Sequence, residues 1–305
     1  MIIVRNRMLF FFITGIITLI ALFSFLAYGL KLSTDFTGGT LVEVTYANGR
    51  PDSAQVTKAL DAAGFKGYSL REAGDKDFIM RSAELSSSQR DVLQTTLTVS
   101  TTSQAAISQF TQVGPTIGTE LRRKALLSIS VVLLCILLFI AFAFRKVSQP
   151  VSSWIYGVIA LITLLHDVIV PVGFFAALGH FAGAEVDTLF VTAVLTVLGF
   201  SIHDTIVVFD RVRENLAINK DRGRKEPFSE TAGRALSQTF VRSINTSMTV
   251  LFTLLVLYFV GPVSTKYFAL TLLVGIIAGT YSSIALATPL LVESERWFSQ
   301  SKGKK

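Results

Sequence analysis

Residues 199–215, GFSIHDTIVVFDRVREN, begin as a membrane helix and end as a charged surface. The first half is almost wholly apolar, yet it contains the neighbouring pair His203 and Asp204. A charged group at membrane depth costs about 2.5–3.5 kcal/mol on insertion scales, so such groups usually face the interior of a helix bundle and serve a function. The stretch therefore predicts a membrane helix that carries a functional acid near one of its ends.

The composition of the whole chain also indicates a membrane protein. Of its 305 residues 51% are hydrophobic, and the mean hydropathy is +0.56, values outside the range of ordinary soluble domains. The formal charge is +7, but the basic residues lie at the edges of apolar runs, where they determine topology, so we expect no nucleic-acid partner. The single cysteine, Cys135, lies inside an apolar run, which excludes an intrachain disulfide.

Six stretches reach the ~20 mostly apolar residues that a membrane helix needs: 8–29, 124–144, 153–177, 187–209, 241–260 and 266–291. The first follows basic residues, as in a signal peptide. It is too long for a signal h-region and lacks a small-x-small cleavage pattern, so we expect 1–29 to hold a retained first span. The fold class predicted is a polytopic α-helical membrane protein with six transmembrane helices, five of them forming a bundle over residues 121–292.

The distribution of Lys and Arg predicts the orientation. Loop 178–186 has neither, whereas basic residues flank the opposite ends of the spans: Arg5, Arg7, Arg145, Lys146, seven in loop 210–240, and Lys302, Lys304 and Lys305 in tail 293–305. By the positive-inside rule both termini, the loop 210–240 and the tail are cytoplasmic. Arg122, Arg123 and Lys124 oppose this assignment, but long translocated segments obey the rule weakly.

Residues 30–120 form the only large hydrophilic segment, which this topology makes extracytoplasmic. Alternating apolar residues and turn signals predict strands at 40–46, 68–72, 77–83 and 105–113 and helices at 51–64 and 86–97. The order β-α-β-β-α-β is that of a ferredoxin-like α+β domain. No His, Cys or carboxylate cluster suggests catalysis here, so we expect a domain that contacts a partner or a passing chain, with a simple spacer as the alternative.

The ionisable groups inside the spans are the candidate functional residues. Arg242 begins the fifth span on the cytoplasmic side, and Asp204 lies near the cytoplasmic end of the fourth span, so the two can meet at similar depth. Asn245 and Thr246 follow Arg242 on one helix face. Burial and a nearby guanidinium act in opposite senses on the proton affinity of a carboxyl, so the pair of Asp204 and Arg242 is predicted to be poised for the uptake and release of a proton. The alternative is an interhelix ion pair that only fixes packing, and Arg211, two turns after Asp204, is a competing partner.

The other polar groups in the spans have plainer interpretations. Asp167 in the third span is expected to be a proton-path group or a packing group whose carboxylate bonds neighbouring Ser or Thr groups. His166 and His203 are expected to be proton-path or packing groups rather than metal ligands. The sequence has no P-loop and no H-E-x-x-H helix. Gly38-Gly39 is too short for a nucleotide loop and is expected to turn the backbone into the first strand. We therefore predict no enzyme, no cofactor and no metal.

Five motifs resemble the SecF family in order and spacing: DFTGGT (35–40), VGPTIGTEL (113–121), HDV (166–168), SIHDTIVVFDRVREN (201–215) and RSINTSMT (242–249). They extend over nearly the whole chain. The first two contain the residues expected to form a structural motif, which are Asp35, Gly38, Gly39, Gly114, Pro115, Gly118 and Glu120. Two positions depart from the family pattern: Ser33-Thr34 replaces a Gly-x pair, and His203 replaces an Asn.

The resemblance implies a function in protein export. SecF is a membrane subunit, related to the resistance-nodulation-division transporters, that acts with SecD at the SecY-type translocon of the bacterial cytoplasmic membrane. Proton movement through the complex is expected to help pull preproteins outward late in translocation. The family's membrane carboxylate falls on Asp204 and its basic residue on Arg242. The alternative is half of a proton-driven small-molecule or lipid exporter, which the small size of residues 30–120 disfavours.

Overall fold

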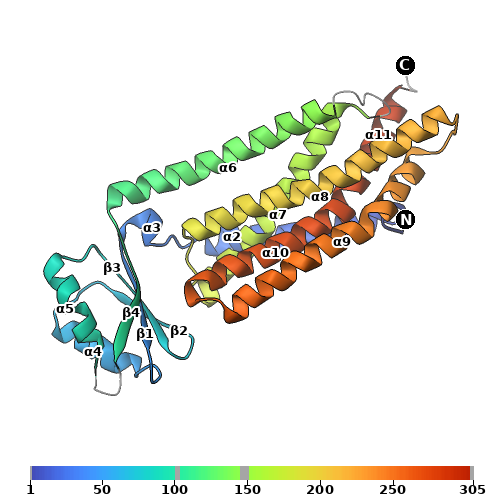
Figure 1. The fold of residues 1–305 in the computed structure, drawn as a ribbon. Helices are drawn as coiled ribbons and strands as arrows, with labels where there is room; N and C mark the ends of the chain where they lie inside the picture. The colour runs from blue at the N-terminus through green and yellow to red at the C-terminus, as the bar shows by residue number, and fades with distance from the viewer. Residues whose placement is uncertain (1, 100–103, 145–150, 303–305) are drawn as a thin grey trace. The chain divides into compact units, whose positions relative to one another are not determined.

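The computed structural model describes residues 2–99, 104–144 and 151–302, so Arg145, Lys146, Lys304 and Lys305 lie outside the described residues (Figure 1). Two compact units are present: one comprises Leu32–Leu127 with Glu185–Thr188, the other Met1–Lys31, Ser128–Ala184 and Leu189–Lys305. The first, here the α+β unit, therefore includes the start of a membrane helix and four residues from a loop far along the chain, beyond the predicted range 30–120.

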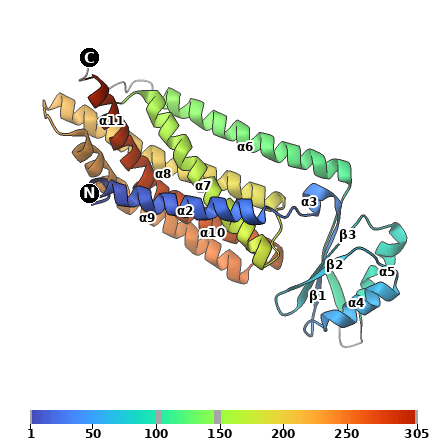
Figure 2. The same ribbon diagram turned by 180° about the vertical axis from the view of Figure 1, so that it is seen from behind.

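The α+β unit has the predicted element order. Its elements are α3 (Thr34–Thr37), β1 (Gly39–Tyr46), α4 (Ser53–Ala62), β2 (Ser69–Ala73), β3 (Asp77–Ser82), α5 (Ser87–Leu97) and β4 (Ala105–Val113). The strands form one antiparallel sheet in the order β2-β3-β1-β4, and α4 and α5 cover one of its faces (Figure 2). The ferredoxin-like prediction is confirmed.

Side-chain alternation explains why this sheet has one core face. Val42, Val44 and Tyr46 of β1 point to the helices, and all three are fully buried with Phe78 and Met80 of β3. Fully burying one such side chain contributes about 1.5–3 kcal/mol. The predicted helix at 86–97 begins with a serine cap: Ser86 forms a capping box with Gln89 at the start of α5.

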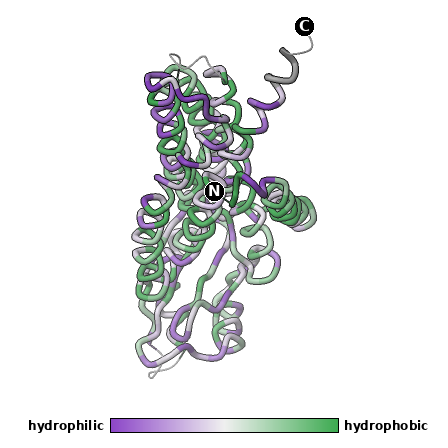
Figure 3. The backbone as a smooth tube through the Cα atoms, turned by 90° about the vertical axis from the view of Figure 1, so that its right-hand side faces the viewer, coloured by the Kyte–Doolittle hydropathy of each residue, from purple (hydrophilic) through white to green (hydrophobic). Residues whose placement is uncertain are grey.

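The second unit is helical. Its elements are α1 (Ile2–Arg5), α2 (Arg7–Tyr28), α6 (Pro115–Ala143, which begins in the α+β unit), α7 (Ser153–Phe181), α8 (Thr188–Asp221), α9 (Phe228–Val260), η1 (Val263–Thr265), α10 (Lys266–Ser282), the π-helical segment η2 (Ser283–Ala287) and α11 (Thr288–Lys302). Among the described residues, six helical segments are long and apolar enough to cross a membrane. Hydrophobic residues, coloured green, run along much of this unit (Figure 3). The predicted number of spans is confirmed.

The helices differ most from the prediction in loop 210–240. It is helical except for residues 222–227, because α8 continues to Asp221 and α9 already begins at Phe228. Polar side chains join the two helices across this hairpin: Asn215 Nδ2 donates to Gln238 Oε1 at 3.0 Å, and Asn219 Nδ2 to Thr231 Oγ1 at 3.0 Å. Charge and polarity suggested a loop, whereas these cross-links stabilise a helical hairpin.

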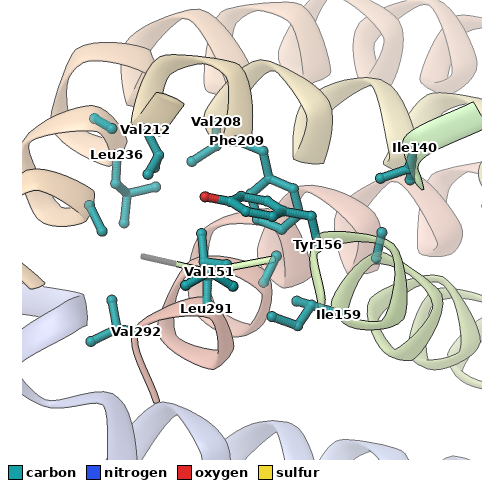
Figure 4. Packing of buried hydrophobic residues seen from close by; sticks show 14 of the residues in the cluster. Ile140, Val151, Tyr156, Ile159, Val208, Phe209, Val212, Leu236, Leu291 and Val292 are labelled. Atoms are coloured by element: carbon teal, nitrogen blue, oxygen red, sulfur yellow. The ribbon is translucent and has the colours of Figure 1, made fainter. Parts of the chain in front are cut away.

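An apolar core holds α7, α8, α9 and α11 together (Figure 4). At its centre the rings of Tyr156 and Phe209 lie edge to face, with centroids 5.2 Å apart, a favourable aromatic arrangement. Elsewhere the helices approach through glycine: a Cβ on Gly173 of α7 would lie 2.2 Å from the Ala21 carbonyl oxygen of α2. Only glycine allows α2 and α7 to approach this closely at that position.

Candidate functional site

Asp167 is a fully buried acid with both carboxylate oxygens in hydrogen bonds. Its Oδ1 lies 2.8 Å from His166 Nδ1, the preceding residue on α7. Its Oδ2 accepts from the hydroxyl of Ser201 on α8 and, at 2.8 Å, from that of Ser282 at the end of α10. All four residues are buried. Three helices therefore converge on one carboxylate, and the expectation that Asp167 bonds Ser neighbours is met.

Two glycines allow α10 to bring Ser282 to this site. A Cβ on Gly275 would lie 2.2 Å from Val197 Cγ2 of α8, and one on Gly279 would lie 2.9 Å from Ser201 Cβ. Gly275 and Gly279 are spaced as in the small-xxx-small pattern of closely packed membrane helices. The π-helical segment η2 follows Ser282 directly, and π-bulges within helices are frequent at functional sites.

Asp204, one turn after Ser201 on α8, has a different environment. Its side chain is also buried, but Oδ2 has no hydrogen-bond partner among the described residues. The groups that act on it electrostatically are His203, the Ser243 hydroxyl and the Arg242 guanidinium, the last two on α9. The Ser243 hydroxyl is likewise buried without a hydrogen-bond partner in the described part of the chain. The carboxylate is therefore enclosed but not satisfied.

Arg242 lies near Asp204 without forming the expected ion pair. Its charge reaches the carboxylate, yet the described residues contain no direct salt bridge between the two side chains, and Arg242 is exposed. Asn245 is exposed as well, and the Thr246 hydroxyl donates to the Arg242 carbonyl at 2.9 Å. The polar face of α9 thus does not close on Asp204 as the sequence suggested; only Ser243 from that segment is buried beside it.

The two remaining candidates on α8 also differ from their predictions. Arg211 does not compete for Asp204: its Nε donates to Gln238 Oε1 at 2.7 Å, and its Nη1 bonds Glu214 at 2.5 Å. Glu214 lies one turn after Arg211 on α8, and Gln238 lies on the facing part of α9. Arg211 therefore forms its hydrogen bonds at the polar end of the helix. His203 is exposed, whereas the corresponding His166 is buried.

The predicted structural motif lies in the α+β unit, and its first three residues, Asp35, Gly38 and Gly39, belong to the segment Ser33–Gly39, here the GG segment. Gly38 and Gly39 have φ values of 80° and 125°, which only glycine adopts readily. A Cβ on Gly38 would lie 2.8 Å from Pro115 Cα. The turn into β1 was predicted, and the packing against the start of α6 adds a second reason for glycine.

The other motif residues belong to the first turns of α6. A Cβ on Gly118 would lie 2.9 Å from the Gly38 nitrogen, so these two glycines pack backbone to backbone. Gly114 directly precedes the helix and meets no such limit. Glu120 pairs with Lys124 at 2.8 Å on the exposed surface of α6. This is a local helix contact and not part of the packing between α6 and the GG segment.

Sequence reasoning missed the two serines that bind Asp167. Ser201 is the first residue of the motif at 201–215, but the motif suggests no role for it. Ser282 lies 115 residues after its acceptor. The signal that points to them is the sequence GIIAGTYSS at 275–283, in which a small-xxx-small pair precedes two serines inside an apolar helix. That pattern predicts a close helix contact with hydroxyls beside it.

Comparisons with known proteins agree with this architecture. Residues 93–297 match the family described as "Protein export membrane protein SecD/SecF, C-terminal", and residues 23–49 match the "SecD/SecF GG Motif". Two relatives carry the name "Protein translocase subunit SecF". That of Thermobaculum terrenum is 43% identical over 96% of this chain and 93% of its own length. That of Anaerolinea thermophila is 38% identical over 97% and 95%.

Solved structures give the same result. The crystal structure of SecDF from Thermus thermophilus, described as a translocon-associated membrane protein, matches 96% of this chain with a TM-score of 0.81 and 31% identity. This chain spans 38% of that longer SecDF chain. With six apolar helices, an antiparallel four-stranded α+β domain and these relatives, the chain is a multi-pass membrane protein that belongs to the SecF family of SecD/SecF protein-export proteins.

Proposed function

We propose that this SecF-family chain acts with SecD to use the proton gradient across the bacterial cytoplasmic membrane in a late step of preprotein translocation. The names of its relatives support a transport role in protein export rather than an enzymatic one, and the match to SecDF supports SecD as the partner. The basic residues at the helix ends support cytoplasmic termini. In this orientation the α+β unit faces away from the cytoplasm, where an emerging preprotein passes.

The observation that carries the proposal is the unpaired, buried oxygen of Asp204. A buried polar atom without a partner costs about 1–3 kcal/mol, and more when it is charged. Such a cost at membrane depth is typical of groups that function in ion or proton transfer. Asp204 therefore serves as the residue that binds and releases the proton.

The surroundings of Asp204 give protonation a mechanical consequence. As a carboxylate it attracts Arg242 across the interface between α8 and α9, and the buried Ser243 hydroxyl of α9 also acts on it without forming a hydrogen bond in the described part of the chain. When a proton neutralises the carboxylate, the attraction to Arg242 ends. Each proton that passes thus changes the force between two membrane helices, and the movement of α8 against α9 is the working step.

The test is preprotein export into inverted vesicles that contain this chain, SecD and a SecY-type translocon, with and without a proton gradient. We expect Asp204→Asn to abolish the gradient-dependent increase in export, because the amide cannot bind and release the proton. Arg242→Leu is expected to reduce it strongly. The matched control is Asp210→Asn, which alters an exposed acid on the same helix that pairs only weakly, at 3.7 Å, with Arg213.

Two outcomes decide between this function and its alternatives. If Asp204→Asn keeps the full gradient-dependent increase while the complex remains assembled, Asp204 is not the proton site. A small-molecule exporter would not co-purify with SecD and the translocon, and its loss would change drug sensitivity rather than the secretion of proteins. For the proposed export subunit we expect the reverse of both results.

A further inference from the structure

The GG segment gathers the starts of two membrane helices within the α+β unit. It contacts the first turn of α6 through the close approach of Gly38 and Gly118. It also contacts the first residue of α8: the Asp35 carboxylate accepts at Oδ2 from the Thr188 backbone nitrogen at 3.0 Å and from the Thr188 hydroxyl at 2.9 Å. Residues Glu185–Thr188 belong to the same compact unit as Asp35.

Asp35 acts as a helix cap supplied from a distant part of the chain. The first backbone N–H groups of a helix have no partner within that helix, and an acceptor at this end stabilises it, the more so when it carries a negative charge. Residue 35 lies 153 positions before Thr188. Ser33 orients Asp35 in turn, since its Oγ accepts from the Asp35 nitrogen at 3.2 Å.

Further contacts within the α+β unit secure the same four residues. The Ser33 nitrogen donates to the Val186 carbonyl at 2.8 Å, and Leu32 and Val186 form a parallel β-bridge. On the sheet, Arg81 of β3 forms an ion pair with Glu185 at 2.8 Å, and both side chains are more than three-quarters shielded from solvent. The start of α8 is therefore held by backbone, capping and ionic contacts together.

The contacts between residues 32–39 and Glu185–Thr188 are here called the joint. The helix that begins at the joint, α8, is the one that carries Asp204. From Thr188 to Asp221 α8 is continuous, and Asp204 lies 16 residues after Thr188, which is about 24 Å along a helix that rises 1.5 Å per residue. A helix over such a distance moves largely as a unit. We propose that Asp35 is a positioning residue that couples the α+β unit to α8, so that movement of α8 at Asp204 is passed to that unit. This rests on the proposed function of Asp204.

The proposal makes a specific demand on the side chain at position 35. An acceptor is needed for the Thr188 donors, but a negative charge is not essential, because Asn caps helices about as well as Asp and Ala does not. We expect Asp35→Ala to lose most of the gradient-dependent increase in export, about fivefold or more, with gradient-independent export unchanged. Asp35→Asn is expected to restore it. A role in folding alone would lower both kinds of export in parallel.

The matched control uses another aspartate cap in the same unit. Asp52 caps α4 by accepting from the Ala54 nitrogen at 3.1 Å, far in sequence from the joint. In the complex with SecD, Asp35→Ala should raise hydrogen exchange of the first turn of α8 about fivefold, as expected for the loss of one cap. Asp52→Ala should instead affect α4 and leave gradient-dependent export unchanged.

A cross-link tests whether the joint works while closed. The bridged pair Leu32 and Val186 suits a disulfide, since neighbouring strand positions lie about 4.8 Å apart. In a Cys135→Ser background, we expect Leu32→Cys combined with Val186→Cys to support export equally well oxidised and reduced. Loss of export on oxidation that reductant reverses would mean that the joint must open, and would overturn the proposal.

The joint and the proton site can fail separately. If Asp204→Asn abolishes gradient-dependent export and Asp35→Ala leaves it intact, the coupling role of Asp35 is wrong and the proton site stands. If Asp35→Ala abolishes it, Asp35→Asn restores it and Asp204→Asn has no effect, the joint stands and the proton site lies elsewhere. If neither change has an effect, both proposals are overturned.

Discussion

Asp167 and Asp204 each follow a histidine inside an apolar helix, yet the structure treats the two acids in opposite ways. Both carboxylate oxygens of Asp167 have hydrogen-bond partners, from its own helix and from two others. Asp204, a single turn from Ser201 in the same region of the bundle, keeps a buried oxygen that has no partner among the described residues. Similar local sequence therefore produces one acid that joins helices and one whose buried oxygen is left unbonded within the described part of the chain.

The difference arises from what faces each acid rather than from its neighbours in sequence. Asp167 faces Ser201 and Ser282, which donate hydrogen bonds and carry no charge. Asp204 faces α9, where the groups that act on it include the Arg242 guanidinium. A carboxylate with hydrogen-bond partners on both oxygens favours packing, whereas a charge that does not contact its counter-charge favours movement. We therefore expect Asp167 to contribute to stability and propose Asp204 for energy coupling.

The largest expected effect is on the stability of the folded chain. Asp167→Ala removes three interhelical or local hydrogen bonds and leaves buried donors unpaired, and we expect a loss of about 2–3 kcal/mol from bonds worth roughly 0.6–1.7 kcal/mol each in membrane proteins. Asp204→Ala removes an unsatisfied acid and should change stability by less than about 1 kcal/mol in either direction. Unfolding of the purified chain in detergent measures both.

Substitution of the same two acids by asparagine controls for the loss of side-chain volume. Asp167→Asn and Asp204→Asn keep the shape of the side chain, so any difference between the two sites reflects hydrogen bonding rather than a cavity. Equal destabilisation at the two positions would contradict the division into a packing acid and an exchanging acid. It would mean that Asp204 also has partners that hold the bundle together.

A smaller effect is expected from the serines that donate to Asp167. Ser201→Ala and Ser282→Ala each remove one donor to the same oxygen, Oδ2, and should each cost about 0.6 kcal/mol and at most about 1.7 kcal/mol. Because they share an acceptor, the double variant should deviate from additivity by at least about 0.5 kcal/mol. A double-mutant cycle measured by unfolding in detergent gives this coupling energy.

Ser247 supplies the control for that cycle. Its hydroxyl is buried and bonds Thr280 at 2.6 Å, so Ser247→Ala removes a comparable interhelical bond that Asp167 does not share. Combined with Ser201→Ala it should be additive within about 0.5 kcal/mol. Full additivity of Ser201→Ala with Ser282→Ala would show that the two hydroxyls act independently, and the convergent site would then lose its special status.

How much of this could be predicted depends on the range of the interactions. The α+β domain was readable because its strands alternate and its caps and turns are local, as with Ser86 and Gln89. The two membrane acids were readable because burial of a charge is costly wherever it occurs. Their different surroundings could not be predicted from the sequence, because Ser282 reaches Asp167 through the close contact of α10 with α8 at Gly279.

The prediction of a loop at 210–240 was wrong for a related reason. Its charges and polar residues resemble those of a solvated connection, and no local signal shows that Asn215 and Gln238 face one another. The pairing requires α8 and α9 to be antiparallel neighbours, which depends on the packing of the whole bundle. Sequence reasoning therefore found the acids and the spans, and it missed the contacts made between residues far apart in the chain.

The smallest expected effect sharpens the comparison with an acid outside the membrane core. Glu226, in the turn between α8 and α9, accepts hydrogen bonds at Oε2 from Asn219 at 2.6 Å and from Thr231 at 2.9 Å. Its own burial opposes ionisation, but hydrogen bonds from Asn219 and Thr231 and the charges of Arg234 and Arg224 outweigh it and lower the pKa of Glu226. A carboxyl whose pKa is lower in the folded state contributes stability above its ordinary pKa of 4.5 and loses that contribution as the pH falls through the folded value.

Glu226→Gln isolates this contribution from that of the other carboxylates. The wild-type chain should melt about 1–3 °C above the variant at pH 7, and the gap should close as the pH falls below 4.5. The gap stays small because the hairpin lies at the polar end of the helices, where water competes for the same hydrogen bonds. A gap that persists at pH 3 would show that hydrogen bonds to the neutral carboxyl suffice. Shape and donors, rather than charge, would then hold this acid in place, as they are proposed to hold Asp167.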